Sequence, residues 1–166
     1  MKTKGAVGIM VALGLVLFLG TSATAELAKK GTYKGSFGWN STGKVFDLEE
    51  GHQIFVGEFT GGFTNADGKG FMHSTSWVCP GVNDTMNNIT QYGRGYCVVT
   101  DLDGDKAYLS WKGGNETKPG EANGTFQWTG GTGKYKGITG DNTYKGMTVL
   151  PMAQGFSMCE GAWQLP

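Results

Sequence analysis

The sequence predicts an all-β protein whose domain, residues 26–166, is a single antiparallel barrel of eight strands. Short runs in which apolar and polar residues alternate recur along the chain, separated by clusters of Gly, Asn and Asp. No amphipathic run of helical period follows the N-terminal segment. Short strands joined by short turns favour antiparallel pairing, because parallel strands need long crossover connections. Eight such strands can close into a barrel and so remove their exposed edges.

The first half of the domain supplies four strands. Thr32–Trp39 places aromatic residues on one face, and Gln53–Thr60 alternates phenylalanines with Ile, Val and Glu. Phe71–Cys79 and Tyr92–Thr100 keep the same period of two, which is typical of a half-buried strand. The segment Pro80–Gln91 between them is expected to be a loop.

The second half supplies the other four strands. Lys106–Lys112 alternates Ala107, Leu109 and Trp111 with polar residues. The turn Asp101–Asp105, DLDGD, joins it to the preceding strand in the clearest hairpin of the chain, because Asp and Gly accept turn geometry. The remaining expected strands are Thr125–Thr129, Lys134–Ile138 and Gly155–Leu165.

Residues 1–25 have the pattern of a secretory signal peptide. Two lysines precede the uncharged, mostly apolar run Gly5–Gly20, and Ala23-Thr24-Ala25 matches the small-x-small pattern before a cleavage site. The alternative is a retained membrane anchor, but the run is shorter than the roughly 20 residues of a spanning helix. We therefore expect a periplasmic or secreted protein without membrane insertion after cleavage of the signal peptide.

The charge balance argues against nucleic acid as a partner. The chain has 14 basic and 14 acidic residues, and loss of Lys2 and Lys4 with the signal leaves 12 basic residues and a net charge of −2. Arg94 is the only arginine, and the lysines form no cluster. Nucleic-acid binding depends on neutralising phosphates with a basic patch. We therefore expect no nucleic-acid partner.

Three cysteines, Cys79, Cys97 and Cys159, follow the signal peptide. Disulfides persist in an oxidising compartment, and an odd number of cysteines leaves at least one thiol unpaired within the chain. Cys79 and Cys97 lie around one predicted loop, Pro80–Gln91. We therefore expect these two to be paired and Cys159 to be free.

No metal site is expected. The aspartates of Asp101–Asp105 have the spacing i, i+2, i+4 of calcium ligands, but an EF-hand places glycine at the sixth position and glutamate at the twelfth. Here glycine stands at the fourth position and Lys112 at the twelfth, so a turn is the better interpretation. The cysteines and the two histidines, His52 and His73, lack the ligand spacing of a zinc site.

The most informative stretch is Trp128–Tyr144, WTGGTGKYKGITGDNTY. Six glycines fall between Gly124 and Gly140, and each costs a helix interior about 1 kcal/mol relative to alanine, so the stretch indicates strands and a tight turn. Over Gly124–Tyr144 the sequence GTFQWTGGTGKYKGITG resembles the late hairpin of the allene oxide cyclase/dirigent group of β-barrels. Gly95–Trp111 and Gly155–Leu165 have a compatible order and length.

This resemblance implies a calycin-like barrel of eight antiparallel strands with an apolar cavity, in a homo-oligomer. The group includes cyclases that act on fatty-acid epoxides and proteins that steer phenoxy-radical coupling. Its functional residues do not carry over, because the matched motif is a turn with its strands and the cavity residues of the group find no match here. The resemblance therefore predicts a fold and leaves the chemistry open.

Six residues are candidates for a functional site. Trp77, Trp111, Phe126 and Trp128 are expected to face inward, where aromatic rings either bind a ligand or fill the core. Glu58 and His73 share predicted faces with apolar residues, so inside a cavity they would form an acid–base pair. The alternative, which we favour, is that each lies on the outer face of its strand.

Three functions fit these observations. Aromatic residues make up 12% of the chain and charged residues only 17%, so a barrel interior would hold few groups for proton transfer. We therefore favour a non-catalytic exported barrel that binds a small apolar ligand or a partner. The alternatives are a cyclase or isomerase with an apolar cavity and a structural or stress-related protein with a filled interior. No cofactor is expected.

Overall fold

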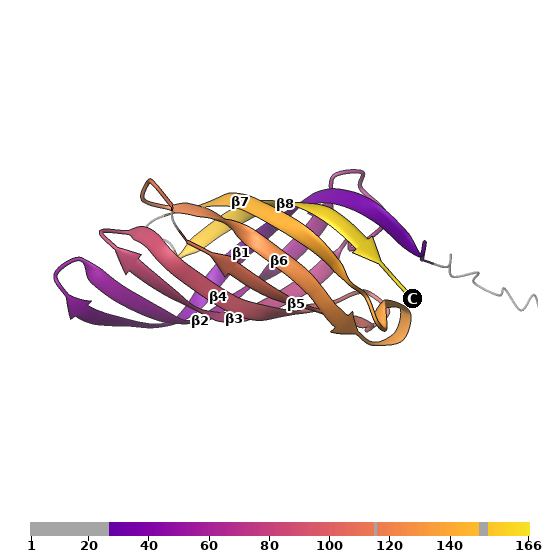
Figure 1. Ribbon diagram of the computed structural model, residues 1–166, viewed down its shortest axis with the longest axis horizontal. Helices are drawn as coiled ribbons and strands as arrows, with labels where there is room; N and C mark the ends of the chain where they lie inside the picture. The colour runs from indigo at the N-terminus through magenta and orange to yellow at the C-terminus, as the bar shows by residue number, and fades with distance from the viewer. Residues whose placement is uncertain (1–26, 115, 150–152) are drawn as a thin grey trace, which may run out of the picture.

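The computed structural model describes residues 27–114, 116–149 and 153–166, so the predicted signal peptide, residues 1–25, lies outside the described residues. The described residues form a closed barrel of eight antiparallel strands, in which each strand pairs with the next and β8 pairs with β1 (Figure 1). This confirms the predicted fold class. The strands are β1 Lys30–Glu49, β2 His52–Asn65, β3 Thr75–Met86, β4 Ile89–Thr100, β5 Lys106–Gly113, β6 Glu121–Gly131, β7 Gly140–Val149 and β8 Gln154–Gln164.

Most strands are longer than the alternating patterns that predict them. The expected loop Pro80–Gln91 is wrong, because β3 and β4 continue through it to a two-residue turn. Asn87 and Asn88 form this turn with φ of 52° and 63°, and asparagine accepts the positive φ that a tight hairpin turn needs. Within the described residues, no helix has the length and apolar character needed to span a membrane.

One predicted strand, Lys134–Ile138, is wrong. Gly133–Tyr135 is instead a short 3-10 helix, η1, and the chain turns again before β7 begins at Gly140. Tyr135 and Ile138 are both buried although they stand three residues apart, which is the spacing of a turn and not of a strand. Gly133 and Gly137 have φ of 47° and 75°, which a residue with a side chain rarely adopts.

The start of the third predicted strand is also wrong. β3 begins at Thr75, and residues 71–74 are a turn in which Met72 and Ser74 both have φ of 58°. Phe71 and Met72 are nevertheless buried. The loop between β2 and β3 therefore folds into the barrel and contributes to its core.

This loop closes one end of the barrel, which lies at the right of Figure 1 with the C-terminus and η1. The Phe71 ring stacks on Trp163 at a centroid distance of 4.1 Å and packs edge-on against Tyr33 and Trp128. Asn65 holds the loop in place by donating a hydrogen bond to the Phe71 carbonyl oxygen at 3.0 Å. Aromatic packing of this kind leaves the closed end filled.

The opposite end, at the left of Figure 1, is formed by the hairpin β1–β2, the hairpin β3–β4, the β5–β6 connection and the ends of β7 and β8. We call this end the mouth. Among the described residues, β1 pairs with β8 only as far as Asn40, whereas its pairing with β2 continues to Glu49. The β1–β2 hairpin therefore projects beyond the rest of the barrel.

Candidate functional site

A cavity of about 110 Å³ lies inside the mouth half of the barrel. The inward positions of the strands alternate large aromatic rings with glycine, and the glycines give the rings room. A Cβ atom added at Gly155 or Gly81 would collide with Trp39 or Trp111, respectively. The aromatic side chains that line the cavity are Phe37, Trp39, Phe59, Trp77, Trp111, Phe126 and Tyr144.

The deeper wall of the cavity contains all three cysteines. Cys79 and Cys97 are joined across β3 and β4, with Cα atoms 4.0 Å apart, which confirms the predicted disulfide. Cys159, on β8, is a free and buried thiol, also as predicted. Burial raises the pKa of Cys159 to about 12, so the thiol is protonated at neutral pH and is a poor nucleophile there.

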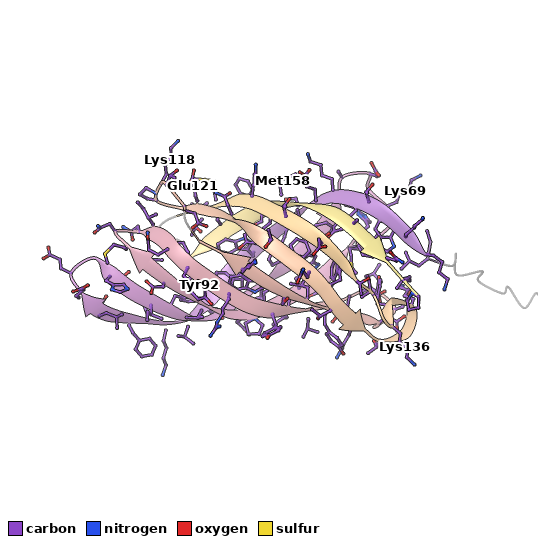
Figure 2. The ribbon with its side chains drawn as sticks, in the orientation of Figure 1. Lys69, Tyr92, Lys118, Glu121, Lys136 and Met158 are labelled. Carbon is purple, nitrogen blue, oxygen red and sulfur yellow. A yellow bond between two sulfur atoms is a disulfide. The ribbon has the colours of Figure 1, made fainter. Side chains whose placement is uncertain are left out.

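The mouth carries the polar part of the lining. Glu116 lies in the connection between β5 and β6 and is only 9% exposed, and Glu121 begins β6. Glu116 Oε1 accepts a hydrogen bond from the Asn123 backbone N–H at 3.1 Å. Glu121 Oε2 accepts hydrogen bonds from the backbone N–H groups of Thr117 and Lys118. Figure 2 shows Lys118 and Glu121 together at this end of the molecule, with Lys136 at the other.

Tyr144, on β7, stands between these carboxylates and the deeper wall as part of the cavity lining. Burial raises the pKa of its hydroxyl, and the nearby charge of Glu116 raises this pKa further. The hydroxyl therefore stays protonated across the physiological range. It provides a neutral polar group beside the aromatic side chains of the wall.

Three of the four predicted ligand-binding residues line the cavity, namely Trp77, Trp111 and Phe126. Trp128 does not. It packs in the filled half, edge-on against Phe71 at 5.7 Å and against Trp77 at 6.0 Å between ring centroids. Phe126 and Trp128 both lie on the inward face of β6. Because β6 begins at the mouth, Phe126 lies nearer the mouth and Trp128 lies deeper, in the filled half.

The predicted acid–base pair, Glu58 and His73, is not brought together in the cavity, and neither residue lines it. Glu58 shares the outer face of β2 with Val56, which is 49% exposed, while Phe59 and Phe63 point inward. His73 lies in the β2–β3 loop at the closed end, outside any strand. Glu58 lies on the outer face of its strand, as we favoured. His73 does not lie on a strand, so the question of its face does not arise.

The aspartates of Asp101–Asp105 form the predicted turn. Asp101 Oδ1 accepts hydrogen bonds from the backbone N–H groups of Asp103 and Asp105 at 2.9 and 3.0 Å. The ammonium group of Lys134 lies 2.6 Å from Asp101 Oδ2 and also pairs with Asp103. Lys134 thus pairs with two of the three carboxylates, and the described residues contain no group of three side chains suited to hold a metal ion.

Glu116 and Tyr144 are functional candidates that the sequence did not single out. Glu116 lies in the loop segment GGNETKPGE, where nothing in the pattern distinguishes a buried glutamate from a solvated one. Tyr144 has a signal that was missed. The alternation of Asn142, Tyr144 and Gly146 predicts an inward face, but only once the strand is placed at Gly140–Val149.

No family model matches the chain, and no curated protein matches it in sequence. Among solved structures, the chain is similar to the pterocarpan synthase dirigent protein, with a TM-score of 0.49 and 12% sequence identity, covering 91% of this chain and 99% of that chain. The barrel is thus similar to a member of the group that the segment Gly124–Tyr144 resembles.

Proposed function

We propose that this chain is an exported, non-catalytic binding protein that holds a small, mainly apolar ligand in the cavity at its mouth. One observation carries the proposal. The same interior is filled with aromatic rings at one end and hollow at the other, and the hollow half is lined by seven aromatic side chains. Burial of apolar ligand surface in such a cavity is favourable by about 25 cal/mol per Å².

Binding is tested with 2-phenylethanol as a neutral probe and 2-phenylethylamine as a cationic one. Trp39, Trp77 and Trp111 line the cavity, so intrinsic tryptophan fluorescence reports its occupancy. Ala122→Trp places a large ring in the cavity and is expected to weaken binding of the probes more than tenfold. Thr125→Trp is the matched control, because it adds the same ring to the exposed face of the same strand. If neither probe binds the unmodified protein, the proposal is wrong.

A cyclase or isomerase is the second candidate function, and one observation favours it. Glu116 and Tyr144 lie close enough in the cavity for the charge of one to act on the other, which gives a carboxylate and a hydroxyl beside an apolar space. We rank binding first, because no histidine is among the described residues of the lining and one oxygen of Glu116 is already held by the backbone. Chromatography of the ligand that co-purifies from the native source, before and after incubation with fresh protein, distinguishes binding from catalysis. Conversion to a new species would favour the enzyme.

We also propose that the protein functions outside the cytoplasm, after loss of residues 1–25. The disulfide between Cys79 and Cys97 supports an oxidising compartment. The N-terminal pattern of two lysines, an apolar run and Ala23-Thr24-Ala25 supports export. The intact mass of the protein recovered from its own compartment tests this proposal. A species that retains residues 1–25 would contradict it.

A further inference from the structure

The cavity contains a carboxylate oxygen without a partner. Glu116 Oε1 is held by the Asn123 backbone N–H, but Glu116 Oε2 is buried and makes no hydrogen bond to any described residue. The Glu116 backbone is fixed as well, since its N–H donates to the Thr90 carbonyl oxygen at 3.3 Å. A buried carboxylate oxygen that lacks a partner is costly, so a group that binds at the mouth and donates to it is favoured.

The charge of the residues that line the cavity indicates which kind of hydrogen-bond donor would bind to Glu116. Glu116 and Glu121 are its only carboxylates, and no lysine, arginine or histidine is found among the described residues that line the cavity. Glu121 already accepts from two backbone N–H groups, whereas Glu116 retains a free oxygen. The protonated Tyr144 hydroxyl does not cancel this charge. Lys118 lies beside Glu121, but no cationic side chain among the described lining residues compensates the charge of Glu116.

The aromatic lining favours a cation for an independent reason. Ring faces carry partial negative charge and attract organic cations, most strongly where water is excluded. Phe59 packs edge-on between Trp39 and Trp111, at centroid distances of 5.2 and 5.9 Å, and all three rings line the cavity below the mouth. A carboxylate above a set of aromatic rings is an arrangement that binds ammonium groups.

We propose that the ligand of this cavity is a small organic ammonium ion, whose hydrocarbon part lies among the aromatic rings and whose charged nitrogen donates a hydrogen bond to Glu116. This inference rests on the proposed binding function and specifies its ligand class. A bare divalent cation fits less well, because calcium takes six to eight oxygen ligands and magnesium a full octahedron. The lining offers two carboxylates, one of them already engaged.

The cavity also limits the size of the ligand. A single water needs about 10–15 Å³ of such space, so a volume of about 110 Å³ admits a molecule of roughly ten non-hydrogen atoms. An arylalkyl monoamine such as 2-phenylethylamine has this size. It also combines the two required parts, an aromatic body and one primary ammonium group.

Isothermal titration calorimetry with three probes of similar size tests the inference at pH 7. The probes are 2-phenylethylammonium, neutral 2-phenylethanol and anionic phenylacetate. We expect the ammonium ion to bind about tenfold or more tighter than the alcohol, which is the usual effect of a hydrogen bond to a charged group. Phenylacetate is expected to bind most weakly. Equal binding of the ammonium ion and the alcohol would overturn the ammonium inference and leave the binding function intact.

The variant Glu116→Gln assigns the preference to one residue. It keeps the size of the side chain and removes the charge, so we expect the ammonium ion to lose its advantage while the alcohol binds as before. Glu58→Gln is the matched control, because it removes one carboxylate from the outer face of β2 and should leave the preference unchanged. If Glu116→Gln keeps the full preference, the assignment to Glu116 is wrong. Should this variant fail to fold, the comparison of the three probes on the unmodified protein still decides the ligand class.

Discussion

Gly124 is an example of a single residue without a side chain that sets the shape of the cavity. A Cβ atom added there would collide with the Lys112 carbonyl oxygen and the Tyr144 hydroxyl. We expect Gly124→Ala to lower the free energy of unfolding by about 1–3 kcal/mol, as overpacking in a filled interior does. Urea denaturation measures the change. Gly38→Ala is the control, because its Cβ would point outward with no atom within 4 Å, and it should change stability by no more than about 0.5 kcal/mol.

Asp101 is a residue through which the stability of the fold depends on pH. Its burial raises the pKa of the carboxyl, but hydrogen bonds from Lys134, Tyr135 and the Asp103 backbone outweigh burial and lower the pKa below its ordinary value of 3.8. A group whose pKa is lowered by folding stabilises the fold above its unfolded pKa, and this contribution is lost as the pH falls through the folded pKa. Asp101→Asn removes the contribution, which we expect to be about 1–2 kcal/mol at pH 7.

The test of this prediction is thermal unfolding of both proteins between pH 7 and pH 2. The difference in stability between the parent and Asp101→Asn should be largest near neutral pH and should narrow below about pH 4. Asp67→Asn serves as control, because Asp67 is exposed and forms no ion pair with any described residue. A constant difference across the whole pH range would mean that Asp101 acts through the shape of the turn and not through its charge.

At the level of single site residues, the sequence predicted the aromatic lining better than its charged group. Trp77, Trp111 and Phe126 are recognisable because a strand alternates its side chains between two faces, so their inward direction follows from local pattern. Glu116 stands in a loop, where no period relates one residue to the next. Its burial comes from the Asn123 backbone and from the neighbouring strands, which are contacts that only the assembled barrel creates.

At the level of strands, the disulfide that joins β3 to β4 closes a segment of 18 residues in sequence. Such a bridge restricts the unfolded chain, and its removal usually costs about 2–4 kcal/mol. We expect the double variant Cys79→Ala/Cys97→Ala to lose this amount in urea denaturation. Cys159→Ser, which removes the free thiol and leaves the bridge in place, is the comparison, and non-reducing peptide mapping verifies the pairing. An unchanged unfolding midpoint in the double variant would contradict the prediction.

The strands show where sequence patterns succeed and where they fail. Alternation predicted β5 within one residue, because Ala107, Leu109 and Trp111 are separated by polar residues and the DLDGD turn marks its start. The pattern failed for Lys134–Ile138, where the buried Tyr135 and Ile138 belong to a turn that plugs the closed end. The burial of such a turn depends on the assembled barrel, which supplies the surface that the turn covers. Local alternation cannot distinguish such turns from short strands.

Across the whole molecule, we expect the two ends to differ in local stability. Thr42–Glu49 of β1 pairs only with β2 among the described residues, and Val45, Phe46 and Leu48 are each at least half exposed. Gly35–Trp39 of the same strand pairs on both sides, and its Phe37 and Trp39 rings are buried. Local opening is easiest where few buried contacts hold a segment, so amides of the projecting hairpin should exchange with deuterium at least tenfold faster. Hydrogen exchange followed by mass spectrometry measures this, and equal protection of the two segments would contradict it.

The plug formed by Phe71, Met72 and Trp163 fills the closed end of the barrel, so we expect a ligand to reach the cavity through the mouth. Association and dissociation then follow the same path and cross the same barrier at the mouth. Substitutions of exposed residues in the β5–β6 connection, such as Pro119, leave Glu116 in place and would then change the association and dissociation rates by the same factor, with the equilibrium affinity nearly constant. Substitutions among the rings of the floor would change residence time alone. The rate of ligand exchange and the strength of binding can thus be changed independently, the first at the mouth and the second at the floor of the cavity.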